Sequence, residues 1–322
     1  MKSFLFLLAI IIAPLAIRAE KPEHPLVNLS IFFSQTDSAG TIIIPIKRVK
    51  NLIVVEAAID TVIGNFVIDT GSPFLVLNST YFRNSYEHDT RVATNATGTT
   101  STLLQTTVSS LRIKELYFEK IQADISDLGH IENKRGIKIL VLLGVKLFLE
   151  YEMIIDQHKG MLYLRKPVPS ATRNPSALDT VLRSAPILKV PFELNHNIIL
   201  VNATVGEKVL TFCVDTGAET NALSNTLPTK VLQNFQVARR TVMLGSGGSR
   251  TEVLLGTLDE LTVGEKKFLN MPAAITRLEM LGEAYGRTLH GILGNPFLVK
   301  GIISINFVTK EIALYPYDVK KP

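Results

Sequence analysis

The sequence predicts a mainly β protein built from two similar lobes that are related by pseudo-two-fold symmetry. The first observation is an internal repeat, in which one half of the chain recurs 146 to 150 residues later. The second is a series of short runs rich in Val, Ile and Phe and bounded by Asn, Asp or Gly, such as 52–59 and 198–205. Short strands separated by turns indicate packed or closed β-sheet in each half. The composition agrees, because 46% hydrophobic and 20% charged residues are typical of a globular protein.

The N-terminus has the parts of a secretory signal peptide. Residues 1–19 contain Lys2, an apolar run over 4–17 and the small residue Ala19. That run is shorter than the roughly 20 residues that span a bilayer as a helix. We expect cleavage after Ala19, export to the periplasm or outside the cell, and no membrane attachment afterwards; an uncleaved anchor is the alternative. Residues 20–40 form an N-terminal extension, which is a candidate pro-segment.

The repeat divides the rest of the chain into two lobes, at 41–165 and 186–322, joined by a linker at 166–185 that is rich in Pro, Ser and Ala. At an offset of 146, Asp69-Thr70-Gly71 aligns with Asp215-Thr216-Gly217; at an offset of 150, Leu143-Gly144 aligns with Leu293-Gly294. The offset changes within the polar stretches 78–97 and 224–247, which are predicted to be loops. Residues 139–149 are apolar and fit either a buried strand or a short helix.

Each Asp-Thr-Gly block directly follows an apolar strand, so Asp69 and Asp215 are expected to emerge from core structure. Pseudo-two-fold packing would place the two carboxyl groups opposite each other. Two carboxylates a few ångströms apart cannot both ionise cheaply, so they share one proton and titrate as a unit. Such a pair can deprotonate a water and protonate a substrate carbonyl, which is amide hydrolysis without a metal or a Ser or Cys nucleophile.

These motifs resemble those of the pepsin-like and retropepsin-like aspartic proteases, and the resemblance covers nearly all of the predicted mature chain. It rests on the hydrophobic-Asp-Thr-Gly-Ser/Ala block in each half and on the later Leu142-Leu143-Gly144 and Ile292-Leu293-Gly294. It implies a two-lobed acid protease fold with the active site in the cleft between the lobes. Asp69 and Asp215 would be catalytic, and the turn would be supported by Thr70, Gly71, Ser72, Thr216, Gly217 and Ala218.

The resemblance also implies flaps that close over substrate, and here the sequence departs from the pepsin pattern. Gly98 and Thr99 lie in the expected flap of the first lobe, which has no Tyr; neither Tyr81 nor Tyr86 is an obvious substitute. Gly247 and Gly248 lie in a Gly-rich segment of the second lobe that resembles a retroviral-type flap. A phosphate-binding loop is a rival interpretation of this segment, but the Lys-Ser/Thr ending is missing.

Ala218 stands where the first lobe has Ser72, so Asp215 loses a candidate hydroxyl donor. Fewer donors raise the pKa of a carboxyl group. We therefore expect activity at weakly acidic to near-neutral pH.

The predicted function is an aspartic endopeptidase that acts on an extended polypeptide, with a peptide-binding pseudo-peptidase as the alternative. A structural or adhesion module would leave both Asp-Thr-Gly turns unexplained. Cys213 is expected to be a small buried side chain rather than a nucleophile; as the only cysteine, it allows no intramolecular disulfide. No cofactor or metal is indicated, and the net charge of +5 is dispersed, so a nucleic-acid partner is not expected. One chain supplies both half-sites, so a monomer is expected.

Overall fold

The structure is a computed structural model that describes residues 11–12, 40–83, 89–94, 100–167, 177–244 and 250–317. Most of the predicted signal peptide and of the extension at 20–40 lies outside these ranges. No helix within them is long and apolar enough to cross a membrane.

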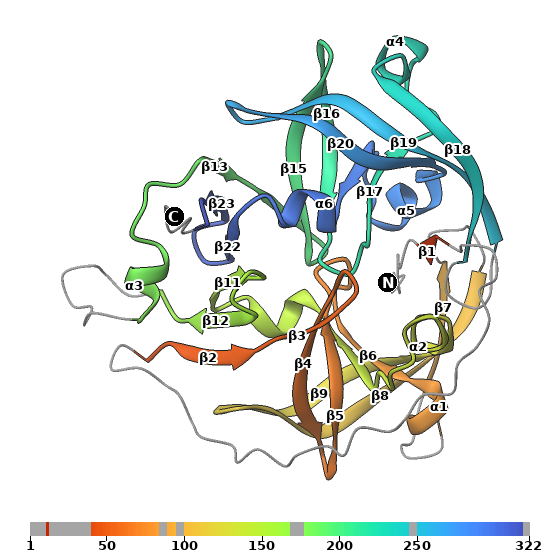
Figure 1. Cartoon of the computed structure of the whole chain (residues 1–322). Helices are drawn as coiled ribbons and strands as arrows, with labels where there is room; N and C mark the ends of the chain where they lie inside the picture. The colour runs from red at the N-terminus through yellow and green to blue at the C-terminus, as the bar shows by residue number, and fades with distance from the viewer. Residues whose placement is uncertain are drawn as a thin grey trace.

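The first half of the chain consists of strands and very short helices (Figure 1). In chain order these are β2 (Ile42–Pro45), β3 (Lys47–Val49), β4 (Leu52–Ile59), β5 (Val62–Ile68), β6 (Leu75–Asn78), α1 (Ser79–Phe82), β7 (Asp89–Thr94), β8 (Thr100–Ile113), β9 (Leu116–Ser126), α2 (Gly129–Arg135), β10 (Val141–Leu143), a 3₁₀ helix (Val145–Phe148), β11 (Glu152–Asp156) and β12 (Met161–Arg165).

The second half repeats this order after the short helix α3 (Ala177–Val181). Its elements are β13 (Leu188–Pro191), β14 (Glu193–Asn195), β15 (Ile198–Val205), β16 (Lys208–Val214), β17 (Asn221–Ser224), α4 (Thr229–Leu232), β18 (Phe235–Leu244), β19 (Arg250–Val263), β20 (Lys266–Thr276), α5 (Glu279–Ala284), β21 (Gly291–Leu293), α6 (Asn295–Leu298), β22 (Ile302–Asn306) and β23 (Glu311–Tyr315). β2 and β13 differ by 146 positions, and β9 and β20 differ by 150, as the sequence repeat requires. The predicted mainly β fold with two related lobes is confirmed.

Each lobe is built on its own curved sheet. In the first lobe the strand order is β3-β4-β5-β10-β6-β9-β8-β7, and an additional pairing of β4 with β8 folds the sheet back on itself. The second lobe repeats this as β18-β19-β20-β17-β21-β16-β15-β14, with β19 pairing to β15. A two-residue strand, β1 (Ile11–Ile12), adds antiparallel to the end of β18. This strand comes from within the predicted signal peptide.

A third sheet of six strands joins the lobes, in the order β13-β23-β22-β11-β12-β2. Three strands come from each half, and the two central strands, β11 and β22, pair antiparallel with Met153 opposite Ile305. Figure 1 shows this sheet beside the two lobe sheets. Because the order is symmetric about the β11–β22 pair, the sheet relates one lobe to the other by an approximate two-fold axis.

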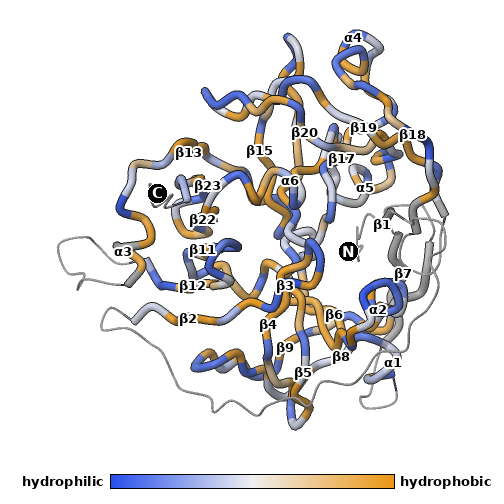
Figure 2. Tube along the Cα trace, in the orientation of Figure 1, coloured by the Kyte–Doolittle hydropathy of each residue, from blue (hydrophilic) through white to orange (hydrophobic). Residues whose placement is uncertain are grey.

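The core follows from strands that are buried on both faces. β4 buries seven of its eight residues, and Phe66 on β5 and its counterpart Phe212 on β16 are almost fully buried. One hydrophobic cluster runs from the first lobe through the shared sheet, by way of Ile155 and Ile305, into the second lobe. Figure 2 shows hydrophobic residues along these inner strands, whereas α2 is largely hydrophilic. The backbone that carries the candidate site is therefore anchored in continuous apolar packing.

The structure corrects one sequence expectation, on the loops, and adds detail to two others. The predicted loops at 78–97 and 224–247 contain α1, β7, α4 and β18. β18 has exposed side chains from Gln236 to Arg240, so its polar sequence reports solvent exposure although its backbone pairs with β19. Residues 139–149 contain the strand β10 and the 3₁₀ helix that follows it, so both the predicted strand and the predicted short helix are present. The linker includes α3, because Leu178 is fully buried against the shared sheet beside Ile154 and Tyr163.

Candidate active site

The candidate catalytic turns are the direct continuation of two buried strands. Asp69 is the first residue after β5, and Asp215 is the first residue after β16. β10 and β21 run parallel to these strands, so the backbone N–H of Asp69 donates to Leu143 O at 3.0 Å and that of Asp215 donates to Leu293 O at 3.0 Å. Each aspartate is thus held at the end of a rigid strand.

Two backbone segments pass close to each other beneath each turn, and this explains why both halves have a glycine there. A Cβ atom on Gly144 would lie 2.1 Å from Phe74 O, and one on Gly294 would lie 2.5 Å from Thr220 O. No side chain fits at either position, because the neighbouring atoms belong to the backbone. The glycine of each Leu-Gly pair in the repeat therefore lies where its backbone packs directly against the segment that follows the Asp-Thr-Gly turn.

The two turns are joined by reciprocal hydrogen bonds between their threonines. The backbone N–H of Thr70 donates to Thr216 Oγ1, and that of Thr216 donates to Thr70 Oγ1, both at 3.0 Å. Each hydroxyl in turn donates across the lobe boundary at 2.8 Å, Thr70 to Val214 O and Thr216 to Ile68 O. All four contacts are buried, so the threonines fix the separation of the two aspartates.

The aspartate carboxyl groups meet between the turns. Asp69 and Asp215 are each only 3% exposed. A Cβ atom on Gly217 would lie 2.6 Å from Asp69 Oδ1 and 3.2 Å from Asp215 Oδ1, so the two carboxyl groups lie side by side. The N–H of Gly71 donates to Asp69 Oδ1 at 3.0 Å, and the N–H of Gly217 donates to Asp215 Oδ1 at 2.7 Å. A Cβ on Gly71 would likewise lie 2.5 Å from Asp215 Cγ. Glycine is thus required on each side to admit the opposite carboxyl group.

Burial makes the pair hold a proton. Desolvation, the charge of Asp215 and the hydrogen bond with Asp215 raise the pKa of Asp69 well above its ordinary value. Burial also raises the pKa of Asp215, to about 6, although the N–H groups of Gly217, Ala218 and Gly71 and the hydrogen bond with Asp69 oppose this. The two carboxyl groups therefore titrate as one unit, and the pair retains a shared proton above about pH 6.

In the structure, the expected activity at weakly acidic to near-neutral pH has a different physical cause from the missing hydroxyl at Ala218. Ser72 donates its hydroxyl to Phe74 O at 3.0 Å rather than to Asp69. The second lobe has Ala218 where the first lobe has a serine, but this difference does not by itself make the pKa of Asp215 differ from that of Asp69. The pKa of Asp215 is raised mainly because this side chain is buried.

Comparisons with known proteins agree with this geometry. A family profile described as aspartyl protease matches residues 201–297. Among solved structures, the aspartic proteinase from Irpex lacteus superposes with a TM-score of 0.50 at 14% identity, over 86% of this chain and 98% of that chain. This chain has the aspartyl protease fold. The resemblance to the pepsin-like and retropepsin-like proteases is thereby confirmed. No curated protein matches the sequence.

Within this aspartyl protease fold, Cys213 precedes Asp215 by two residues and is 2% exposed. It packs with Ala218, Leu281 and Ile292 in the second lobe. Burial, followed by the charges of Asp215 and Asp69, raises the pKa of its thiol well above the usual range. The thiol stays neutral, and the expectation of a small buried side chain is confirmed.

The predicted flap residues lie outside the described residues. Gly98 and Thr99 fall between β7 and β8, and Gly247 and Gly248 fall between β18 and β19. Their contribution to substrate binding stays a prediction. Within the described part of the chain, no three His, Cys, Asp or Glu side chains are grouped to hold a metal ion.

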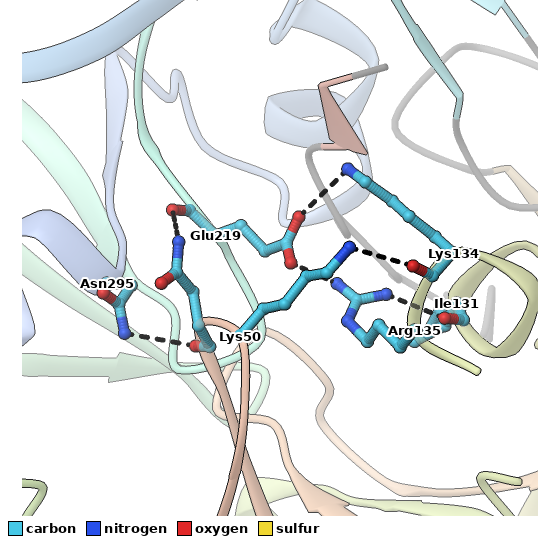
Figure 3. A network of polar contacts seen from close by, with 7 residues as sticks. Lys50, Ile131, Lys134, Arg135, Glu219 and Asn295 are labelled. Carbon is cyan, nitrogen blue, oxygen red and sulfur yellow. Dashed lines mark hydrogen bonds and ion pairs between the residues drawn. The ribbon is translucent and has the colours of Figure 1, made fainter. Parts of the chain in front are cut away.

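Sequence reasoning missed a charged contact between the lobes beside the second turn (Figure 3). Glu219, four residues after Asp215, accepts from Arg135 Nη2 at 2.5 Å and from Lys134 Nζ at 3.4 Å. Both basic residues end α2 of the first lobe, and the side chain of Arg135 is fully buried. Asn51, also in the first lobe, donates to Glu219 O at 3.2 Å.

A second missed contact lies beside the first turn. Tyr285, which directly follows α5 of the second lobe, donates its hydroxyl to Gly71 O at 3.2 Å. Neither residue stands out in the sequence, because Glu219 aligns with Pro73 and Tyr285 aligns with Arg135 in the repeat. Only the tertiary arrangement shows that these side chains cross between the lobes.

Proposed function

We propose that the protein is an aspartic endopeptidase that uses Asp69 and Asp215 as its catalytic pair. The observation that carries this proposal is the close approach of two buried carboxyl groups, on repeat-related turns that reciprocal threonine hydrogen bonds hold together. The family profile and the fold support peptidase chemistry in general.

The proton distribution suggests the role of each residue. In the proposed mechanism Asp215 acts as the carboxylate above about pH 6 and Asp69 acts as the acid, because burial and the charge of Asp215 raise the pKa of Asp69 well above its ordinary value. Asp215 would take a proton from a water bound between the two groups as the water oxygen attacks the scissile carbonyl carbon, while Asp69 gives its proton to the carbonyl oxygen. Collapse of the resulting tetrahedral diol would break the C–N bond, with a proton passing to the leaving amine.

The substrate we propose is an extended polypeptide, because such a chain satisfies its backbone groups by pairing with strand-like flaps and places alternate side chains in pockets. Export to the periplasm or outside the cell, and a monomeric state, stay predictions from the sequence.

We expect the purified protein to cleave denatured casein and a pepstatin-type statine inhibitor to stop the cleavage. The statine hydroxyl mimics the tetrahedral diol and would be held by both carboxyl groups. The readout is the appearance of new peptide termini by mass spectrometry, with a metal chelator and a serine protease inhibitor as controls that should have no effect. Inhibitor binding without any cleavage would instead indicate the pseudo-peptidase.

We expect kcat/KM for peptide cleavage to rise as the pH increases through about 6 and to fall only when Asp69 loses its proton. The active form needs Asp215 ionised, and burial raises the pKa of Asp215 to about 6. A rate–pH profile measured from pH 3 to 9 on one fluorogenic peptide tests this. A profile confined below about pH 4, close to the pKa of an ordinary Asp, would contradict it.

A further inference from the structure

Besides the two threonines, the described residues include a pair of equivalent positions from which each lobe reaches across to the opposite turn. Arg135 in the first lobe aligns with Tyr285 in the second at an offset of 150. Arg135 contacts Glu219 beyond the second turn, and Tyr285 contacts Gly71 within the first. The duplicated scaffold thus supports its two turns through different chemistry, an ion pair on one side and a phenol on the other.

The Tyr285 hydroxyl is held firmly in place. Tyr285 is 3% exposed and packs among Cys213, Ala218, Leu281 and Leu289 of the second lobe. The bond to Gly71 O crosses from that cluster into the first lobe. A buried phenol in fixed packing is a directed hydrogen-bond donor, and removing such a donor leaves the buried acceptor unsatisfied.

The bonded carbonyl belongs to the peptide group that supports Asp69. The carbonyl of Gly71 and the N–H of Ser72 form one peptide unit. That N–H donates to the backbone carbonyl of Asp69 at 3.2 Å, and it also lowers the pKa of the Asp69 carboxyl group. Donation to the carbonyl polarises the peptide and strengthens its N–H as a donor. Tyr285 is therefore connected to Asp69 through a single peptide group.

We propose that Tyr285 is a positioning residue that orients and polarises the Gly71–Ser72 peptide and so determines how firmly Asp69 holds the shared proton. The inference deepens the proposed endopeptidase function and rests on it.

The other titratable groups around the Tyr285 hydroxyl are Cys213, Asp215 and Asp69. Burial and the charges of these three groups raise the pKa of Tyr285 well above its usual range, so the phenol keeps its proton. Burial likewise keeps the Cys213 thiol neutral. Only the two aspartates change charge near neutral pH, so a change in their titration after substitution of Tyr285 reports on the aspartates themselves.

The test is the Tyr285→Phe variant, followed by the titration of the Asp69 and Asp215 carboxyl groups. The full-length protein would carry ¹³C at the aspartate carboxyl carbons, and NMR signals would be assigned with Asp69→Asn and Asp215→Asn. We expect the upper titration step of the pair to move upward by about 0.5–1 pH unit, the equivalent of one ordinary hydrogen bond. The basic limb of the kcat/KM profile should move with it.

Tyr81→Phe is the matched control, because it also removes a phenol hydrogen bond, which runs from Tyr81 in α1 to Glu132 Oε1 in α2 at 2.8 Å instead of to a backbone carbonyl of the paired turns. Tyr81→Phe should leave the titration unchanged. Site-specific 3-fluorotyrosine at position 285 keeps the ring and is a stronger donor, so it should shift the same step downward. This second variant gives an answer even if Tyr285→Phe folds poorly.

Identical titrations of wild type, Tyr285→Phe and the fluorotyrosine variant would overturn the inference. The NMR titration needs no cleavage, so it distinguishes the two proposals. If the two aspartates of the wild type titrate as a pair but the protein cleaves no peptide, the endopeptidase function is contradicted. The positioning role of Tyr285 would still be decided by the change in the aspartate titration between the wild type and the Tyr285 variants.

Discussion

Replacing either Asp69 or Asp215 with Asn is expected to lower kcat/KM for peptide cleavage by about 10⁴-fold, the upper end for a single positioned acid or base. The effect should be this large for both variants, because in the proposed mechanism the two carboxyl groups share one proton and neither performs both transfers alone. The measurement is cleavage of one fluorogenic peptide at pH 7. Asp156→Asn is the control, because Asp156 is equally buried but lies in the shared sheet, where its Oδ1 accepts from the N–H of Lys159.

The same variants should keep their stability at pH 7. The pKa of Asp215 is raised on folding, so its stabilising contribution is complete below the ordinary value of 3.8 and is lost as the pH rises through about 6. At pH 7 the wild type therefore carries the cost of burying a charge, which Asn removes. Asn also retains an oxygen for the N–H of Gly217. Urea unfolding at pH 7 should give a midpoint equal to or above that of wild type. Near-normal cleavage by either variant would refute the paired mechanism.

Glu219→Gln is expected to destabilise the protein by about 3–5 kcal/mol, because it leaves the buried Arg135 guanidinium without a counter-charge. Burial already lowers the pKa of Arg135, and Glu219 is the residue that opposes this shift. The Nε atom of Arg135 has no partner, and the contact that remains, from Nη1 to Ile131 O at 2.9 Å, is to an uncharged carbonyl that does not replace the lost counter-charge. Urea unfolding at pH 7 measures the change. Cleavage should fall as well, since Glu219 lies only four residues after Asp215.

Glu207→Gln provides the matched control for this effect. Glu207 pairs with Lys230 at 2.8 Å, but both side chains are largely exposed, and exposed pairs contribute little. A double variant, Glu219→Leu with Arg135→Met, removes both buried charges and should recover much of the lost stability. If Glu219→Gln unfolds at the same urea concentration as Glu207→Gln, the contact in Figure 3 does not hold the lobes together.

The internal repeat made much of the fold predictable. Each Asp-Thr-Gly block could be placed at the end of a strand because apolar runs such as 210–214 lead directly into it. The strand β18 was missed, since its exposed Arg239 and Arg240 resemble a loop when only the sequence is read. Hydrophobic patterning reports which side chains are buried, and it is silent about backbone pairing at the rim of a sheet.

The sequence by itself determined the duplicated β architecture and nominated Asp69 and Asp215, because a repeated motif at a fixed offset must occupy equivalent places in two equivalent lobes. Only the tertiary structure decided how the halves differ. Arg135 and Tyr285 occupy the same position in the repeat, yet one pairs with Glu219 and the other donates to Gly71 O. Contacts between lobes depend on distances and directions across the approximate two-fold axis, and linear spacing along the chain does not encode these.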